Sequence, residues 1–242
     1  MQSEKRHFKF YVDFDGTIST KDIGEHMFVE FGDAKKSYEI IKEWLDGKIS
    51  SQDVWLRLCA SVENFDKNKF DEYLDACSID EGFKDFLDYC VKYEFDVTIV
   101  SDGLDYYINH ISKKNDFDHL KTFSNKVEIT KDGNLIPNFP YTDEECKDCA
   151  NCKRNHILNS SSDEDITIYI GDGWSDTCAA QHCDFIFAKR SLLKYCESNS
   201  VPYYPYKSFN DVTKIVENLR TKKKIKKRNQ VRLKRREAYM QG

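Results

Sequence analysis

The chain has 242 residues, of which 40% are hydrophobic and 14% aromatic, and its formal net charge is −5. This length and apolar content can fill the core of one sizeable domain, or of a domain with an insertion. No run approaches the ~20 apolar residues that a membrane-spanning helix requires, and the polar N-terminus shows no apolar export signal. These features argue against a membrane protein and predict a soluble, cytoplasmic one.

The charge is distributed unevenly along the chain. The segment from Arg220 to Glu237 holds eleven Lys or Arg and one acid, whereas the remainder carries 26 basic and 41 acidic residues. Such a segment could bind nucleic acid, but no aromatic residue is interleaved with its charges before Tyr239. We favour a solvated helical or disordered end, or one that docks on the acidic body, over binding to nucleic acid.

Three of the nine cysteines form a cluster at Cys146, Cys149 and Cys152. Together with His156 they have the spacing of zinc ligands on a helix. The same spacing also places them on one buried stripe of a helix expected over residues 143–158. In a cytoplasmic protein we favour reduced, buried thiols, and a metal at this cluster stays open as the alternative.

The first predicted element is a buried strand over residues 8–12, and it ends in two carboxylates. Asp13 and Asp15 are two positions apart, so both can project to the same side of an extended chain. The carboxyl ends of strands are where open α/β sheets bind ligands. Two carboxylates at this distance repel each other, so the pair needs a cation or a shared proton.

Residues 19–80 carry helical rather than strand patterns. Apolar residues recur at helical spacing over 21–31, 38–45 and 70–77. Ser50 and Asp53 have the spacing of a capping box before a further helix. Because some sixty residues are too many for a simple crossover, we expect a separate helical lobe.

Strand and helix patterns alternate after this insertion. The expected helices are 81–93, 105–113, 143–158, 178–182 and 209–219; the expected strands are 95–100, 166–170 and 185–187, with a hairpin over 127–137. Such alternation implies a parallel sheet covered on both faces. Two further strands end in polar turns, at Ser101-Asp102-Gly103 and at Gly171–Asp176. Oxygen donors at three strand ends suit a hard cation such as Mg²⁺.

The ordered motifs Asp13–Thr17, Ser101, Lys153 and Gly171–Asp176 resemble those of the haloacid dehalogenase superfamily of phosphatases. The resemblance covers residues 8–215. It is strongest to the phosphoserine-phosphatase-like branch, and within it to methionine-salvage enol-phosphate phosphatases and phosphocholine phosphatases. It implies an α/β fold with a Rossmann-like parallel sheet core and a small all-helical cap inserted after the first strand. The implied boundaries are 1–18 and 81–219 for the core, 19–80 for the cap and 220–242 for the basic tail.

The resemblance also implies Mg²⁺-dependent hydrolysis of a small phosphorylated metabolite through an aspartyl phosphate. Asp13 would be the nucleophile, and Asp15 the general acid that later acts as the base. Asp13, the Asp15 carbonyl and Asp172 would ligate the metal, and Asp176 would support these ligands from behind.

Ser101 and nearby backbone N–H groups would hold the phosphate oxygens, and Asp102 would belong to the same substrate- or phosphate-binding set. The alternative for Ser101 is a cap of the next helix. Lys153 would neutralise the converging anions. The rival cations for this role are Lys147, Arg154 and Lys189.

Asp22 lies nine residues after Asp13, where similar phosphatases keep an acid that faces the substrate. Glu25 and His26 are rivals for that role, and the alternative for Asp22 is a helix N-cap.

Two other functions stay open from the residues alone. One is a phosphotransferase or mutase of the same fold, and the other is a non-catalytic phosphate-site protein that binds RNA through its basic tail. Four acid or hydroxyl side chains brought together are costly to bury without use, which argues against an inactive site.

Overall fold

The computed structural model describes residues 6–144 and 148–241, and the chain divides into two compact units. The first unit comprises residues 1–18, 79–100 and 153–242, and the second comprises 19–78 and 101–152. The helical segment after the first strand is therefore grouped with residues 101–152.

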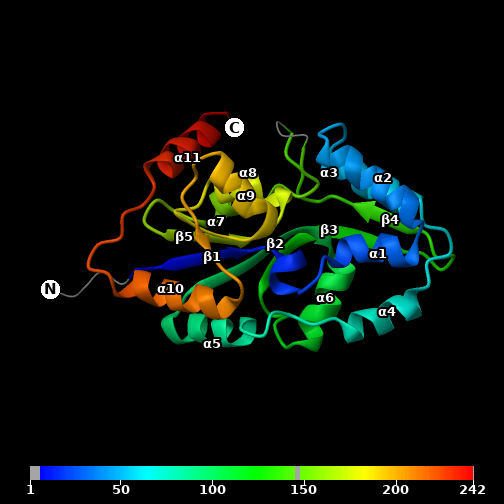
Figure 1. Cartoon of the computed structure of the whole chain (residues 1–242), viewed down its shortest axis with the longest axis horizontal. Helices are drawn as coiled ribbons and strands as arrows, with labels where there is room; N and C mark the ends of the chain where they lie inside the picture. The colour runs from blue at the N-terminus through cyan, green and yellow to red at the C-terminus, as the bar shows by residue number, and fades with distance from the viewer. Residues whose placement is uncertain (1–5, 145–147, 242) are drawn as a thin grey trace. The chain divides into compact units, whose positions relative to one another are not determined.

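The first unit is built from alternating strands and helices (Figure 1). Its elements are β1 (Phe8–Val12), α5 (Phe83–Tyr93), the first part of β2 (Asp96–Leu104), α7 (Lys153–Ser160), β5 (Ile166–Gly171), α8 (Thr177–Ala180), β6 (Phe185–Ala188), α9 (Arg190–Ser198), β7 (Tyr204–Pro205), α10 (Phe209–Thr221) and α11 (Asn229–Gln241). Adjacent strands β2-β1-β5-β6-β7 all pair in parallel. Val12 pairs with Ile99 on one side and with Ile170 on the other, so β1 and β5 end at the same edge of the sheet.

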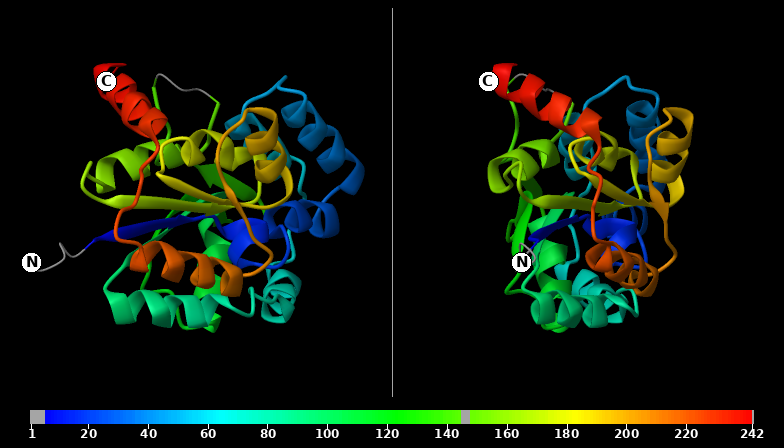
Figure 2. Two further views of the ribbon diagram at one scale, coloured as in Figure 1. Left: turned by 60° about the vertical axis from the view of Figure 1, so that its left-hand side comes forward. Right: turned by 90° about the vertical axis from the view of Figure 1, so that its left-hand side faces the viewer.

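Helices cover both faces of these strands. In both views of Figure 2, as in Figure 1, α5 and α10 lie on one side of β1 and β5, and α7 and α8 lie on the other. All six residues of β5 are buried, as expected for a parallel strand between two helical layers. Phe10 packs edge-on against Phe86 at 5.1 Å between ring centroids, and Phe86 also meets Phe209 at 5.1 Å. Burial of each such ring stabilises the folded state by about 1.5–3 kcal/mol.

The second unit contains a helical segment and a hairpin. Its elements are α1 (Ile23–Phe31), α2 (Ala34–Leu45), α3 (Ser51–Ala60), α4 (Lys67–Ala76), the end of β2, α6 (Asp105–Lys114), β3 (Lys121–Ile129) and β4 (Leu135–Asn138). Strands β3 and β4 pair antiparallel, which confirms the predicted hairpin. The complete sheet has the order β4-β3-β2-β1-β5-β6-β7, so the prediction of a mostly parallel α/β sheet is confirmed.

Each helix from α1 to α4 begins at a side chain that accepts a backbone N–H. The caps are Asp22, Asp33, Ser50 and Asp66, and Ser50 with Asp53 forms the predicted capping box. Phe28 and Trp55 pack against each other at 5.8 Å and are buried. These two aromatic residues therefore belong to the core of the second unit.

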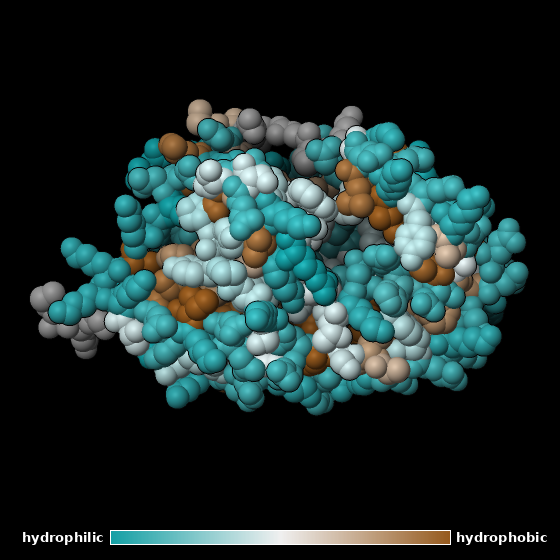
Figure 3. All heavy atoms as spheres, in the orientation of Figure 1, coloured by the Kyte–Doolittle hydropathy of each residue, from teal (hydrophilic) through white to brown (hydrophobic). Residues whose placement is uncertain are grey.

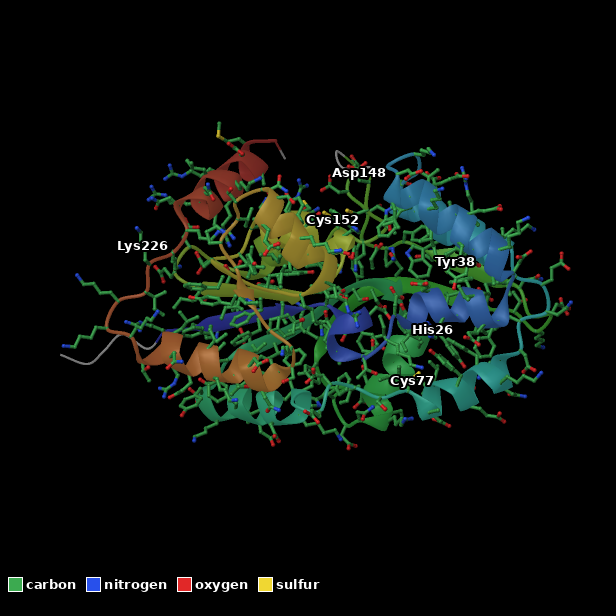
Figure 4. The ribbon with its side chains drawn as sticks, viewed as in Figure 1. His26, Tyr38, Cys77, Asp148, Cys152 and Lys226 are labelled. Atoms are coloured by element: carbon green, nitrogen blue, oxygen red, sulfur yellow. The ribbon has the colours of Figure 1, made fainter. Side chains whose placement is uncertain are left out.

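The helix expected over residues 143–158 is wrong in its first part, because α7 begins only at Lys153. Asn151 holds the preceding loop in place: its N–H donates to Asp102 Oδ1 at 3.0 Å, and its Nδ2 donates to the Ser101 carbonyl at 2.7 Å. Cys152, labelled in Figure 4, also lies before the helix. Cys149 and Cys152 thus do not form the predicted helical stripe, and Cys146 lies outside the described residues.

The pattern analysis did not predict α9 or β7, and it left the state of the tail open. The helix expected over 178–182 is the four-residue α8. Among the described residues, no helix combines the length and hydropathy needed to cross a bilayer.

Candidate active site

Two carboxylates mark the edge of the first unit where β1 and β5 end. Asp13 directly follows β1, and its backbone N–H continues the strand pairing by donating to the Ile170 carbonyl at 2.9 Å. Asp172 directly follows β5. Both side chains are buried, with 4% and 8% exposure for Asp13 and Asp172. The sheet therefore holds two anionic groups that the sequence separates by more than 150 residues.

Lys153 supplies the buried cation of this site. It is the first residue of α7 and is 3% exposed. Its ammonium donates to Asp13 Oδ1 at 2.6 Å, to Asp176 Oδ1 at 2.7 Å and to Ser175 Oγ at 3.3 Å. Burial by itself would lower the pKa of Lys153, but the charges of Asp13 and Asp176 raise it above the usual range. The ammonium therefore stays protonated between two carboxylates.

Asp176 is fully buried and fastens the loop after β5. Its Oδ2 accepts the backbone N–H groups of Asp172 and Gly173, both at 2.9 Å. Its Oδ1 accepts the Tyr169 hydroxyl at 2.6 Å and the Lys153 ammonium. Four donors thus fix one carboxylate, and this carboxylate in turn orients the backbone that carries Asp172.

The remaining negative charge is only partly balanced. Burial, and then the charge of Asp176, raise the pKa of Asp13 well above its usual value, and Lys153 opposes this shift. Burial and the same neighbour raise the pKa of Asp172 to about 6, with Arg190 acting in the opposite direction. Carboxylates with raised pKa values favour protons or other cations nearby.

The donor set fits a divalent metal ion. Oxygen atoms of Asp13, Asp172 and Asp176 all lie within 4.8 Å of one another. Three carboxylates against the one ammonium of Lys153 leave an excess of two negative charges among these four buried side chains. Hard oxygen donors with this residual charge suit Mg²⁺.

Arg190 is a site residue that the sequence reasoning missed. Its Nη1 donates to Asp172 Oδ2 at 3.0 Å, while Thr17 Oγ1 donates to Oδ1 at 3.2 Å. Arg190 has a left-handed backbone with φ of +48°, an unusual conformation for this residue type. No sequence pattern marks it, because it simply follows Lys189 after β6.

Gly16 makes room for this arrangement. Its φ is +68°, and a Cβ atom there would stand 2.5 Å from Asp172 Oδ2 and 2.7 Å from Arg190 Nη1. Both the backbone and the space therefore require glycine at this position.

The rival cations from the sequence are now distinguishable. Of the described candidates, Lys153 is the cation that donates a hydrogen bond to Asp13. Lys189 lies over the Tyr206 ring at 4.9 Å, and burial lowers its pKa. Arg154 bonds its neighbour Asn155 at 3.3 Å, and Lys147 lies outside the described residues.

The other predicted site residues have the following positions. Asp15 lies half-buried in the turn after Asp13, with an extended backbone (φ −69°, ψ 127°). Ser101 and Asp102 lie in the part of β2 that belongs to the second unit. Asp22 is the N-cap of α1 and accepts the Glu25 N–H at 2.8 Å.

Ser101 does not cap the next helix, because α6 begins at Asp105. Its hydroxyl accepts the Gly103 N–H at 3.0 Å, inside β2. The Asp102 carboxylate accepts the Ser51 hydroxyl and the Asn151 N–H. Both side chains therefore take part in the internal hydrogen bonding of the second unit.

Gly171→Ala should impair the site. A Cβ atom there would stand 2.4 Å from Asp176 Oδ2, which its four donors prevent from moving. We expect the unfolding free energy to fall by about 1–3 kcal/mol. Turnover should fall by about tenfold to hundredfold, as is typical when catalytic groups are displaced by about 1 Å. Gly173→Ala is the matched control, since its Cβ would meet nothing closer than 3.8 Å. Equal effects of the two variants on denaturation and turnover would contradict this view of Asp176.

Sequence comparisons connect this geometry with known proteins. A family model described as "Putative Phosphatase" matches residues 9–197. A 2-hydroxy-3-keto-5-methylthiopentenyl-1-phosphate phosphatase of Lysinibacillus sphaericus is 31% identical over 216 residues, covering 86% of this chain and 93% of the relative. The Pdp3-interacting factor 1 of Schizosaccharomyces pombe is 28% identical over 230 residues, covering 90% of this chain and 98% of the relative.

Solved structures share the fold at low sequence identity. A HAD-family hydrolase from Salmonella enterica serovar Typhi matches with a TM-score of 0.69 and 19% identity, over 88% of this chain and 72% of that one. A substrate-bound phosphoserine phosphatase matches with a TM-score of 0.67 and 20% identity, over 88% and 99% of the two chains. These matches confirm the architecture expected from the sequence.

Proposed function

This chain belongs to the putative phosphatase family and is a phosphatase of the haloacid dehalogenase type. From that premise we propose that it hydrolyses a small phosphorylated metabolite. The proposed reaction requires Mg²⁺ and passes through an aspartyl phosphate on Asp13. One observation carries the proposal: the Lys153 ammonium is hydrogen-bonded to both Asp13 and Asp176, with Asp172 close by. A carboxylate, a fixed ammonium and a metal-compatible acidic cluster are the groups that phosphoryl transfer requires.

In the proposed reaction, an Asp13 carboxylate oxygen attacks phosphorus and the bond to the leaving alcohol breaks. Asp15 donates a proton to the departing oxygen. Asp15 then takes a proton from a water molecule, which attacks the phosphoryl group and releases inorganic phosphate and free Asp13. Lys153 holds Asp13 in place and offsets negative charge at the phosphoryl oxygens. We assign binding of those oxygens to the Ser101 hydroxyl and to nearby backbone N–H groups such as that of Asp102.

We assign the metal to Asp13, the Asp15 carbonyl and Asp172, with Asp176 orienting the loop that carries Asp172. A bound Mg²⁺ would supply positive charge for the phosphoryl oxygens. The excess of buried carboxylates over buried cations supports this assignment. The Arg190 guanidinium, which already bonds Asp172, would keep that side chain oriented.

Chelation should test the metal directly. EDTA is expected to lower turnover by at least about a hundredfold, because a metal contributes several kcal/mol of charge stabilisation, and added Mg²⁺ should restore it. Burial raises the pKa of Asp172 to about 6. Protons therefore compete with the metal at Asp172 below about pH 6, and the apparent Mg²⁺ affinity should rise as the pH increases from 5 to 7.

The measurement is initial rate against Mg²⁺ concentration at several pH values, with calorimetric titration of Mg²⁺ as a readout independent of activity. Turnover that resists EDTA, or an affinity that is flat across this pH range, would contradict the metal assignment.

The substrate is best sought with a panel of phosphorylated metabolites. The named activity of the bacterial relatives makes an enol phosphate the first candidate, and phosphoserine and phosphocholine follow from the sequence resemblance. Released inorganic phosphate is the readout, and an added alcohol reveals transfer to an acceptor other than water. Failure of every phosphomonoester to react would end the proposal.

We further propose that Asp22 faces the substrate, and its role as an N-cap makes a clean test possible. Asparagine caps a helix as well as aspartate does, so Asp22→Asn should leave stability within about 0.5–1 kcal/mol of wild type. If the charge contacts the substrate, kcat/KM should fall by about tenfold, the equivalent of one charged hydrogen bond. The matched control is Asp33→Asn at the cap of α2, where no change in kcat/KM is expected. Identical kinetics for both variants would restrict Asp22 to capping.

The cysteines support a reducing environment for this enzyme. All eight cysteines among the described residues carry free thiols, and most of them are buried. Free thiols are typical of reducing compartments. We therefore propose the cytoplasm as the place of action and small phosphorylated metabolites as the partners.

A further inference from the structure

A cavity of about 400 Å³ lies in the first unit, where β5 and β6 begin. Its walls come from residues 162–165 before β5, from Asp184 before β6 and from residues 227–236 of the basic tail. The groups of the proposed active site follow the opposite ends of the strands. The six residues of β5 at ~3.3 Å each put about 20 Å between the two places. This cavity is therefore separate from the Asp13 site.

The basic tail docks on the first unit rather than remaining solvated. Figure 2 shows α11 on the same side of the strands as α7, and Figure 3 shows mainly hydrophilic atoms along the segment between α10 and α11. Lys227 Nζ donates to the carbonyls of Asp163 and Asp165 at 2.6 and 2.5 Å. Arg235 donates to the Ser161 hydroxyl and carbonyl at 3.0 and 2.8 Å, and Val231 is 3% exposed. These contacts form one wall of the cavity.

Three guanidinium donors in this wall lack hydrogen-bond acceptors. Arg228 Nε and Nη1 and Arg235 Nε are buried without a hydrogen-bond acceptor. Among the described residues of the first unit, no other buried side-chain nitrogen or oxygen lacks a hydrogen-bond partner. Arg235 is 95% buried, and its Nε is 3.6 Å from Asp163 Oδ1, too far for a hydrogen bond. Buried charged donors without acceptors are costly, and an anion would satisfy them.

Two of the three acidic groups of the cavity already have other donors. Asp165 accepts from His7 at 3.0 Å and from the Ser162 N–H at 2.7 Å. Burial by itself would raise the pKa of Asp165, but these hydrogen bonds lower that pKa to about 2. Asp184 accepts the N–H and hydroxyl of Thr167 at 3.0 and 3.1 Å. The third, Asp163, forms an ion pair with Arg235 Nε at 3.6 Å. Five basic side chains still face three acidic ones in the lining, so the cavity remains short of negative charge.

We propose that this cavity binds a small molecule carrying one or more phosphoryl groups, held by Arg228, Arg232 and Arg235. Several guanidinium groups in one concave site match the tetrahedral oxygens of phosphate, to which arginine donates in pairs. The volume falls in the usual range for metabolite sites. Ten of the eleven lining residues are polar or charged, so we expect the ligand to be a compact hydrophilic anion. Since the wall includes the tail, a bound anion would also fasten α11 to the first unit.

An extended nucleic acid fits these observations less well. The unpaired donors are buried in a cavity rather than displayed along a surface. No aromatic side chain lines it to stack with a base, as single-strand binders require.

The test is calorimetric titration of the full chain with inorganic pyrophosphate and, separately, orthophosphate, both in EDTA. Arg228→Gln should weaken binding of at least one anion by roughly tenfold or more, since it removes charged hydrogen bonds. Its rate on p-nitrophenyl phosphate with Mg²⁺ should match wild type, because Arg228 is remote from Asp13. Arg232→Gln, at an exposed cavity position, provides a second variant that leaves the buried contacts of α11 intact. It should weaken the same anion by about threefold to tenfold.

Lys226→Gln is the matched control, since it removes the same charge from the same segment outside the cavity (Figure 4). It should bind both anions as wild type does. Wild-type affinity in both arginine variants would overturn the proposal. An equal loss of anion affinity in all three variants would also overturn it. The same holds if single-stranded RNA, titrated in the same way, binds wild type and loses affinity equally in all three variants. Either outcome would indicate a diffuse basic surface.

Discussion

Asp13→Asn should reduce hydrolysis of any accepted phosphomonoester by at least about 10⁴-fold, comparable to the loss of other catalytic nucleophiles. The amide is nearly isosteric and still accepts the Lys153 hydrogen bond, but its oxygen does not attack phosphorus effectively. Burial raises the pKa of the Asp13 carboxyl, so replacement by a neutral amide should leave the unfolding free energy unchanged or slightly higher. Steady-state rates together with chemical denaturation measure both effects.

Asp80→Asn is a suitable control for this result. Its carboxylate accepts the Gly82 and Phe209 N–H groups at 2.9 and 3.1 Å, so these hydrogen bonds go to backbone groups and not to Asp13, Lys153 or Asp176. We expect its turnover to stay within about twofold of wild type, as for changes outside the reacting groups. Mass spectrometry of acid-quenched reactions should find one added phosphoryl group on the peptide that contains residue 13 in wild type and in Asp80→Asn, but not in Asp13→Asn. Near-normal activity of Asp13→Asn would assign the attack to another group.

Lys153→Gln should lower both stability and activity. It leaves the carboxylates of Asp13 and Asp176 buried without their ammonium partner, at an expected cost of about 3–5 kcal/mol in unfolding free energy. Turnover should fall by about 10²–10³-fold, as for removal of one group that stabilises transition-state charge. Urea denaturation and kcat measure the two effects separately.

The pH dependence identifies the cause of the lost stability. Removing the cation raises the pKa of Asp13 further, so the folded variant binds more protons than its unfolded state above about pH 4. Its stability deficit should therefore grow as the pH rises from 5 to 8. Lys194→Gln is the control: that lysine has an exposed side chain on α9, and its loss should produce no such trend. A deficit that does not change with pH would point to lost packing instead.

The sequence predicted most of the elements because their signals are local. The apolar run before Asp13 and the hairpin over 127–137 appear as expected, and so does the capping box of Ser50 and Asp53. Each rests on interactions within a few residues, which a single segment displays. The motif residues Asp13 and Asp172 were found in the same way, at strand ends.

Prediction failed where distant groups decide the local structure. The helix expected over 143–158 is interrupted because Asn151 bonds backbone and side-chain atoms of Ser101 and Asp102, some fifty residues away. Arg190 was missed because its significance lies in contact with Asp172 and in the space left by Gly16. Neither contact leaves a periodic pattern in the chain.

The amino-acid sequence by itself determined the strand and helix alternation, the family resemblance and the acidic strand ends, because backbone propensity and motif spacing are properties of short segments. Only the tertiary structure decided that Lys153, rather than Lys189 or Arg154, bonds Asp13, and that the basic tail docks beside β5. Pairing of charges and burial of donors depend on which surfaces meet in three dimensions, and residues far apart in a chain carry no record of that meeting in their local pattern.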